Sequence, residues 1–279
     1  MNTEKKTLPP PSERAMSNHD SQRNIAYLNS FGWVGGKHEL RPKIATYIPS
    51  DIKQYIEPFG GAGWVLFYKE RWARYEIYND LNSDLTNLFT MIKHHSEALV
   101  KEMEFMIPSE ETFYTLKSEF KPLTEIQRAA RFLYLLSYSF SALQSNFVCS
   151  NNANIRSLEN LKAKILKLGQ RLDRVMILNR DYEQVLEKYD GKDSFFYLDP
   201  PYFAYSKGLN KVYKEIEHEK LAGILKNIKG KFLLSYNNDD YIKNLYSNFE
   251  IIHLSKSHKF SNGGGVGRGY EELLIKNYK

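Results

Sequence analysis

The sequence predicts an α/β protein in which a mostly helical segment interrupts a sheet-forming chain. Short, almost continuously apolar runs recur, as buried strands of a parallel or mixed sheet do. Amphipathic helical patterns lie between some of them, which is typical of α/β layering. A long stretch, residues 86–172, contains no convincing strand. The expected strands are 54–58, 75–80, 174–179, 195–199, 231–237, 249–255 and 272–278.

Composition limits the class of protein. The chain has 279 residues and is 42% apolar, enough for one large domain or for a domain with an insert. Its net charge of +6 favours an anionic partner. The single cysteine, Cys149, excludes an intramolecular disulfide and a cysteine zinc cluster, and it indicates a reducing cytoplasm. The histidines show no metal-ligand spacing, so we assign no metal.

The first 24 residues form neither a signal peptide nor an expected element. They hold too few apolar residues to offset the entropy cost of ordering, so we expect 1–24 to be a disordered tail. No window reaches the roughly 18 apolar residues of a membrane span.

Helical patterns divide the remaining chain. Residues 218–230 have one apolar face, and Gly230 is a plausible C-terminal stop. Thr124 and Gln127 fit a capping box that opens a helix, and 158–172 repeats the helical pattern. We therefore expect 86–172 to be an insert between two halves of an α/β domain, 25–85 and 173–279. An outer layer of helices on the main sheet is the alternative interpretation.

The tetrapeptide DPPY, residues 199–202, stands where a buried strand ends. A residue before proline is extended, and neither Pro200 nor Pro201 has an N–H. The backbone therefore offers carbonyl oxygens with few competing donors. Asp199 adds a carboxylate acceptor, and Tyr202 adds an aromatic face. A planar ring with an exocyclic amine matches this set, and both adenine and cytosine fit; a helix cap or a simple Pro-Pro turn is the structural alternative.

Such an acceptor set has a chemical use. Hydrogen bonds to the Asp199 carboxylate and the Pro200 carbonyl would hold the amine hydrogens out of the ring plane. The nitrogen lone pair would then be localised and aimed at an electrophile. The proton can leave after the nitrogen has become cationic, so the aspartate need not act as a base before attack.

The electrophile is predicted to lie beside a glycine-rich turn. Gly60, Gly61 and Gly63 follow the strand 54–58, allow a tight turn close to a ligand, and lead into an expected apolar helix. Asp80 ends the next strand, seventeen residues after Gly63, where an acid can bind ribose hydroxyls. The turn is not a phosphate-binding loop of the GxxxxGK[ST] type. A ribose-bearing cofactor without pyrophosphate is therefore favoured, and S-adenosylmethionine is such a cofactor.

An upstream segment, residues 31–40, adds two candidates. Trp33 could pack on the cofactor, and Lys37 could reach a carboxylate. An ordinary turn with a core tryptophan and a solvated lysine is the alternative.

The motifs GWVGGK (32–37), EPFGGAG (57–63), YNDLNSDL (78–85) and DPPY, in this order, resemble the Dam-like family of DNA adenine N6-methyltransferases. The segment 261–274 is also similar to the family's C-terminal signature. The resemblance implies a Rossmann-like S-adenosylmethionine-dependent methyltransferase sheet with an inserted, mostly helical DNA-recognition domain. It implies catalysis at Asp199, Pro200, Pro201 and Tyr202, and cofactor binding at Trp33, Lys37, Phe59, Gly60, Gly61, Gly63, Asp80, Asp181 and Asp199.

DNA contact is expected outside the acceptor site. Residues 251–270 contain no acid and five glycines, as a flexible basic loop against phosphates would. We therefore assign Lys256, Lys259, Asn262 and Arg268 to DNA binding; a solvated loop is the alternative. Arg128, Arg131 and Arg156 in the insert are candidates on the same footing.

One departure from the family concerns the segment after the helix that contains FLYL. The arginine and Asn-Gly that usually lead into a DNA-reading hairpin are missing, and the room for a hairpin is short. The target sequence and strict duplex specificity therefore stay open.

The prediction is a site-specific adenine methyltransferase that flips its target base out of DNA, which we expect to be double-stranded. It is expected to be a monomer from the cytoplasm of a bacterium or a phage-infected cell, and a cognate restriction endonuclease remains an open partner. A nucleic-acid-binding protein without turnover, or methylation of cytosine N4, RNA or a protein glutamine, are the alternatives. The Asp that opens DPPY favours adenine.

Overall fold

The computed structural model describes residues 31–33, 35–139, 142–148, 158–202, 217–255 and 271–279. The expected tail, 1–24, lies outside these ranges. None of the described helices is long and apolar enough to cross a membrane.

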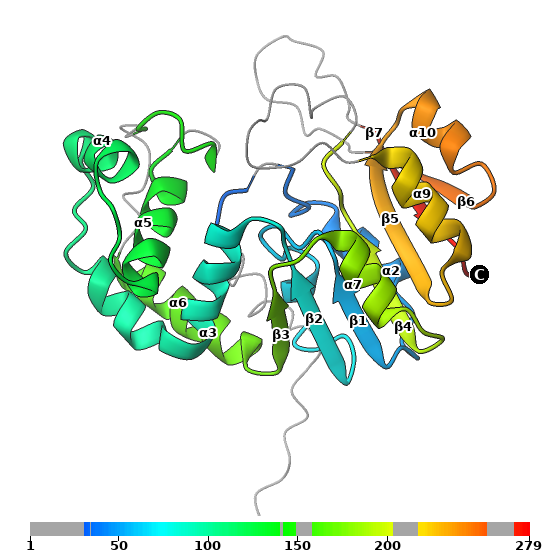
Figure 1. Cartoon of the computed structure of the whole chain (residues 1–279), viewed down its shortest axis with the longest axis horizontal. Coiled ribbons are helices and arrows are strands. Elements are labelled where there is room, and N and C mark those ends of the chain that lie inside the picture. The colour runs from blue at the N-terminus through cyan, green and yellow to red at the C-terminus, as the bar shows by residue number, and fades with distance from the viewer. Residues whose placement is uncertain (1–30, 34, 140–141, 149–157, 203–216, 256–270) are drawn as a thin grey trace, which may run out of the picture.

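One seven-stranded sheet forms the centre of the molecule (Figure 1). Its strand order is β3-β2-β1-β4-β5-β7-β6. β7 runs antiparallel to both of its neighbours, and the other neighbouring pairs are parallel. All seven expected strands are confirmed. They are β1 Gln54–Glu57, β2 Tyr75–Asn79, β3 Val175–Leu178, β4 Ser194–Leu198, β5 Lys231–Asn237, β6 Glu250–Ser255 and β7 Glu271–Lys276.

The sheet separates two apolar cores, which explains why its strands read as continuous apolar runs. Successive side chains of a strand point to opposite faces. In β4, Phe195 and Tyr197 join one core, and Phe196 and Leu198 join the other. All four side chains are at most 3% exposed. Burial on both faces therefore decides the composition of the central strands.

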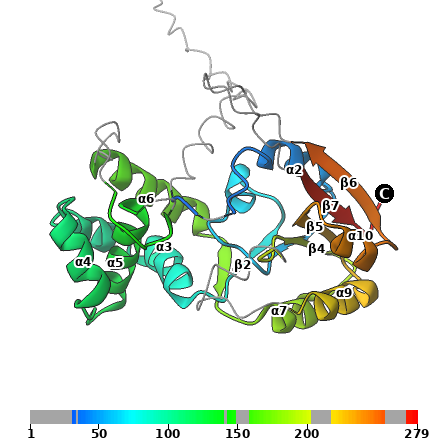
Figure 2. The same ribbon diagram turned by 90° about the horizontal axis from the view of Figure 1, so that it is seen from above.

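Helices cover both faces of the sheet, and a second group stands beside its β3 edge (Figure 2). α7 and α9 lie on one face and α2 lies on the other, whereas α3 to α6 extend away from β3. The helices are α2 Arg41–Tyr47, α3 Ser83–Met103, α4 Glu110–Ser118, α5 Glu125–Ser137, α6 Leu158–Leu172, α7 Tyr182–Tyr189, α9 His218–Asn227 and α10 Asp240–Leu245, with a 3₁₀ turn η1 at Leu66–Tyr68.

Within the helical group α3 to α6, the expected cap that opens α5 is confirmed. The Thr124 hydroxyl accepts the N–H of Gln127 at 3.1 Å. The Gln127 side chain reaches back to the N–H of Leu123 at 2.9 Å, one residue before the cap. In α6 the expected face is buried at Ile165, and also at Leu168 and Leu172. These helices share one continuous apolar core with the sheet.

Two local expectations were wrong. The glycine-rich turn leads into the single 3₁₀ turn η1 instead of an apolar helix. Tertiary partners take the carbonyls that a helix would use: Trp72 Nε1 donates to Val65 O, and Arg171 donates to Leu66 O, both at 2.9 Å. Second, α9 ends at Asn227, before Gly230. Gly230 instead allows a close approach, because a Cβ there would lie 2.9 Å from the carbonyl oxygen of Ser194.

Candidate active site

The predicted motifs converge at the carboxyl ends of neighbouring parallel strands. The glycine-rich turn follows β1, Asp80 follows β2, and Asp199 follows β4. The chain order reverses between β1 and β4, which are neighbours in the sheet. Ligands of open α/β sheets bind at such a switch point, outside the carboxyl ends of the strands. The topology therefore places all three motifs at one ligand-binding edge.

Asp199 is held by three donors. Lys37 Nζ lies 2.7 Å from Asp199 Oδ1. The Ser235 hydroxyl donates to the same oxygen at 2.8 Å, and the Tyr202 hydroxyl does so at 3.3 Å. Asp199 caps none of the described helices. This arrangement argues against the helix-cap alternative.

Lys37 is a buried cation inside the acceptor site. Its side chain is 3% exposed, and Nζ also donates to the carbonyl of Gly35 at 3.1 Å. A second carboxylate oxygen, Glu272 Oε2, lies 3.9 Å away, and the Tyr202 ring centroid lies 4.8 Å away. Burial alone would lower the pKa of Lys37, but the charges of Asp199 and Glu272 raise it above its ordinary value. Lys37 therefore stays positively charged.

The ring of Tyr202 packs against a second aromatic ring. Its ring centroid lies 5.5 Å from that of Tyr236, with the planes inclined by 30°. The Tyr236 hydroxyl is in turn hydrogen-bonded to Nδ1 of the buried His218. Tyr202 is partly exposed, so one part of its surface remains accessible. A planar ligand could stack there, as bases stack on aromatic side chains.

The glycine-rich turn is tight and brings its backbone close to Trp33. Gly61 has φ +50°, and a Cβ there would lie 3.0 Å from Trp33 Nε1. The turn is closed by hydrogen bonds from Gly60 N to Asn79 O at 2.7 Å and from Gly63 N to Gly60 O at 2.8 Å. Trp33 and the turn, predicted from separate segments, therefore lie side by side.

Asp80 binds the same turn. Its Oδ2 accepts the N–H of Gly61, and its Oδ1 accepts the N–H of Asn82, both at 2.8 Å. The side chain is 4% exposed. Burial raises the pKa of Asp80 to about 6, although the two backbone N–H groups oppose this rise. Asp80 therefore anchors the turn as well as ending β2 at the predicted position.

The remaining predicted cofactor residues lie after β1 and β3. Asp181 is the N-cap of α7 and accepts the N–H of Glu183 at 3.0 Å. The ring of Phe59 lies 5.0 Å from the ring of Tyr182, the first residue of that helix. Phe59 is thus in contact with the segment that Asp181 begins.

Three polar residues of this region were missed by the sequence analysis. Ser235 lies in the middle of an apolar strand, and Glu272 is the second residue of β7, so neither belongs to a recognisable motif. Glu57 ends β1, is 1% exposed, and accepts the Tyr55 hydroxyl at 2.6 Å. Burial raises the pKa of Glu57 to about 8, and hydrogen bonds from Tyr55 and the Leu66 N–H oppose the rise. An acid that ends an apolar strand was the available signal for Glu57.

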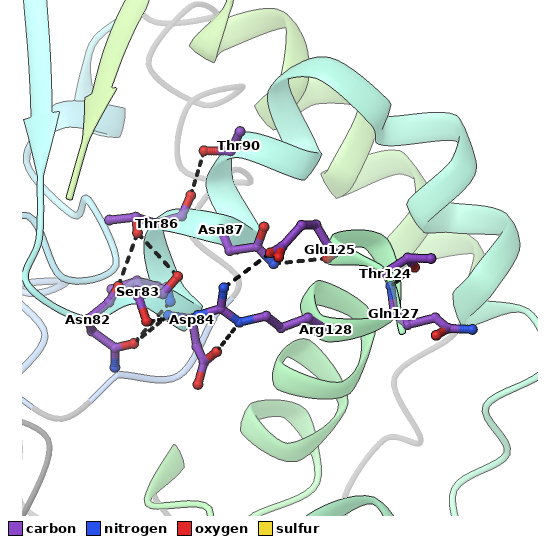
Figure 3. Close-up of polar contacts among 11 residues, drawn as sticks. Asn82, Ser83, Asp84, Thr86, Asn87, Thr90, Thr124, Glu125, Gln127 and Arg128 are labelled. Carbon is purple, nitrogen blue, oxygen red and sulfur yellow. Dashed lines mark hydrogen bonds and ion pairs between the residues drawn. The ribbon is translucent and has the colours of Figure 1, made fainter. Parts of the chain in front are cut away.

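The arginines proposed for DNA contact in the helical group have internal partners. Figure 3 shows Arg128 between the first turns of α3 and α5. Arg128 pairs with Asp84 at 2.6 Å and with Glu125 at 3.1 Å. Arg131 donates to the carbonyls of Leu116 and Lys117 at the end of α4. Arg156, Lys256, Lys259, Asn262 and Arg268 lie outside the described residues.

The segment after α5 differs from its expectation. Ser139 and Phe147 form an antiparallel bridge, and Val148 N donates to Tyr138 O at 3.0 Å. Ala142 and Gln144, which lie between them, have φ values of 59° and 53°. The chain therefore does reverse here, in the place where the sequence left little room for a hairpin.

The strand order, the glycine-rich turn after β1 and the acids after β2 and β4 define a methyltransferase-type α/β enzyme. A family model described as D12 class N6 adenine-specific DNA methyltransferase matches residues 33–260. The chain therefore belongs to that family, and it is an adenine-specific DNA methyltransferase.

Relatives extend over nearly the whole chain. It is 28% identical over 262 residues to the Type II methyltransferase M.CviBI of Paramecium bursaria Chlorella virus NC1A, covering 88% of this chain and 98% of that protein. It is similarly 28% identical to the Type II methyltransferase M.MjaIII of Methanocaldococcus jannaschii, covering 88% and 97%. The DNA adenine methylase of Haemophilus influenzae is 29% identical over 61% of this chain and 62% of its own.

Proposed function

We propose that this enzyme takes the methyl group from S-adenosylmethionine and that Asp199 and Pro200 hold the amine of an extruded adenine. The observation that supports this proposal is the Asp199 carboxylate, fixed at a ligand-binding edge beside the aromatic face of Tyr202. Within the described residues, all three of the contacts given above go to Asp199 Oδ1, which leaves Oδ2 for the substrate amine.

The residues around the glycine-rich turn suit this cofactor. The close approach of Gly61 to Trp33 leaves room for backbone and an aromatic ring but not for a side chain. Asp80 supplies carboxylate oxygens next to the turn, as ribose hydroxyls require. Phe59 and Asp181 would border the adenine of the cofactor. When bound, S-adenosylmethionine supplies an electrophilic methyl group on a sulfonium.

The chain's own groups would prepare the amine for attack. Asp199 Oδ2 and the Pro200 carbonyl accept the two hydrogens of adenine N6, and the Tyr202 ring holds the base plane. The nitrogen lone pair is then directed out of the ring toward the methyl carbon. Methylation would leave the nitrogen cationic, and its extra proton would then pass to solvent. Acceptors that are fixed before reaction stabilise the developing positive charge without reorganisation.

DNA would contact both the helical group and the basic segment 256–270. We propose that the helical group acts as the target-recognition domain, 86–172, between catalytic halves 25–85 and 173–279. Because Arg128 and Arg131 have internal partners, Lys256, Lys259, Asn262 and Arg268 become the preferred phosphate contacts. Duplex DNA as substrate and a monomeric enzyme are parts of the same proposal. A restriction–modification role is a further part, and the names of the Type II relatives support it.

The first prediction concerns Asp199→Ala. Without the acceptor carboxylate, transfer of a labelled methyl group from S-adenosylmethionine to unmethylated DNA should fall by at least about 10²-fold, the loss that follows removal of one preorganised group. Circular dichroism should show a retained fold, with some loss of stability because Lys37 loses its closest carboxylate.

A matched control is Asp193→Ala. Asp193 precedes the same strand and pairs with Lys53 at 3.0 Å, but both side chains are at least 60% exposed. Its transfer rate should equal that of the unsubstituted enzyme. Appreciable transfer by Asp199→Ala would refute the proposed role. A protein that binds DNA but transfers no methyl group before any substitution would support the binding-only alternative.

A further inference from the structure

The contacts of Asp199 are distributed unequally between its two oxygens. In the described part of the chain, Lys37, Ser235 and Tyr202 all bind Oδ1. An ionised carboxylate is symmetric and can use either oxygen, so the three donors decide which one faces the ligand. The residues around Asp199 create this asymmetry, which suggests that they orient its carboxylate.

The donors to Asp199 differ in whether they can also accept a hydrogen bond. The hydroxyl of Ser235 can donate or accept, and it also lies 3.2 Å from the Tyr197 hydroxyl, with either as donor. The ammonium of Lys37 has three donors and no acceptor, so it demands an acceptor atom opposite it. Lys37 therefore determines which atom of the residue 199 side chain faces it: that atom must be an acceptor.

The position of Lys37 is itself fixed. Its side chain is 3% exposed, and Nζ is held by the Gly35 carbonyl at 3.1 Å. Glu272 Oε2, 3.9 Å from Lys37 Nζ, provides a second negative charge beside the ammonium. Because the Lys37 ammonium is buried and held by two carboxylates and a carbonyl, it is already ordered. It therefore loses little conformational freedom when it orients Asp199.

We infer that Lys37 is a positioning residue that fixes Asp199 with Oδ2 toward the adenine amine, assisted by Ser235. This inference rests on the proposed function, because it assigns Oδ2 to the substrate amine. It adds a role to the cofactor contact predicted for Lys37 from the sequence.

The substitution Asp199→Asn tests whether Lys37 orients the side chain at position 199. In Asp199→Asn, the Lys37 ammonium must face the amide oxygen, because it can only donate. The amide NH₂ then points toward the substrate amine, where two hydrogen-bond donors face each other and no hydrogen bond can form. Single-turnover methyl transfer to unmethylated DNA should therefore fall by about 10²-fold or more. In the double variant Lys37→Met with Asp199→Asn, the amide can rotate and present its oxygen. Transfer should then recover at least about tenfold over Asp199→Asn alone, a change of about 1.4 kcal/mol in the barrier.

The double variant is also the milder change for the fold. Removing both members of a buried ion pair costs less than removing one and leaving the other unpaired. Lys53→Met is the matched control, since this lysine is 67% exposed in its pair with Asp193. It should leave transfer unchanged in both backgrounds. Thermal melting should show each variant folded at the assay temperature.

Three results would overturn the inference. The first is a double variant no faster than Asp199→Asn while it still binds S-adenosylmethionine and remains folded. The second is Lys37→Met that transfers methyl groups at the rate of the unsubstituted enzyme once S-adenosylmethionine is saturating, which would leave Lys37 no role beyond cofactor binding. The third is Asp199→Asn at the rate of the unsubstituted enzyme. Absence of transfer by the unsubstituted enzyme would instead count against the proposed function, so the two failures are distinguishable.

Discussion

Asp80 shows how one carboxylate can serve both the backbone and a ligand. Both of its oxygens accept backbone N–H groups, from Gly61 and Asn82, and these bonds keep the glycine-rich turn against the end of β2. Each carboxylate oxygen has a second lone pair. A ribose hydroxyl could therefore bind without breaking either bond. The turn and the proposed cofactor site would therefore depend on the same buried residue.

A prediction at this scale concerns Asp80→Asn. The amide has one acceptor oxygen, so one of the two N–H groups would face an NH₂ group and the turn would loosen. We expect the dissociation constant for S-adenosylmethionine to rise by about tenfold or more, as loss of a charge-assisted hydrogen bond implies. Calorimetry measures this constant directly.

The pH dependence supplies the control. The pKa of Asp80 lies near 6, so its ionised, accepting form becomes dominant above that value. Affinity of the unsubstituted enzyme for S-adenosylmethionine should therefore rise from pH 5 to pH 7, and the rise should be smaller in Asp80→Asn. Equal affinities and parallel pH profiles would mean that Asp80 does not bind the ribose.

At the scale of elements, Arg171 joins the helical group to the sheet. It stands in the last turn of α6 and forms a two-pronged ion pair with Glu76 of β2, with both N–O distances 2.8 Å. The same guanidinium donates to the carbonyls of Leu66 and Lys69. The Arg171 and Glu76 side chains are 6% and 3% exposed. One arginine therefore fixes α6, β2 and the segment after η1 together.

We predict that Arg171→Met destabilises the protein strongly. Breaking a buried ion pair by removing one partner costs about 3–5 kcal/mol, because the other charge stays buried without compensation. Lys162→Met, in the same helix, is the control: Lys162 pairs with Glu104 and Glu159, which are more exposed, and should cost at most about 1 kcal/mol. Urea unfolding measures both. Similar losses in the two variants would contradict the role given to Arg171.

Across the whole molecule, the parts that could be predicted are those governed by local pattern. The strands were found because burial on both faces leaves continuous apolar runs, and Thr124 was found because a cap depends on neighbours three residues away. The motif residues were found because the glycines and DPPY have unusual backbone requirements. Their roles in binding and catalysis remain predictions.

The remaining features depend on residues far apart in the chain. Arg171 and Glu76 are separated by 95 residues, and Ser235 and Asp199 by 36. Arg128 looked like a free cation until the fold brought Asp84 beside it. The helix expected after Gly63 does not form, because Trp72 and Arg171 donate hydrogen bonds to the carbonyls of Val65 and Leu66. No local pattern contains these pairings, because tertiary packing creates them.

The last prediction concerns Glu57 and the stability of the whole chain. Its folded-state pKa, about 8, lies above the ordinary value of 4.5. Between these values the folded protein holds a proton that the unfolded chain has lost. The stability that this proton contributes is complete below pH 4.5 and is lost as the pH rises through 8. One such proton lowers the free energy of unfolding by at most about 1.4 kcal/mol per pH unit.

Glu57→Gln removes this titration and keeps an acceptor for the Tyr55 hydroxyl. From pH 6.5 to 7.5, urea unfolding of the variant should therefore show a shallower loss of stability than the unsubstituted protein. This window lies above the pKa of Asp80, so the difference between the two slopes reports Glu57. Parallel slopes would mean that Glu57 is already ionised in the folded protein at pH 6.5, and that burial beneath the acceptor site does not protect its proton.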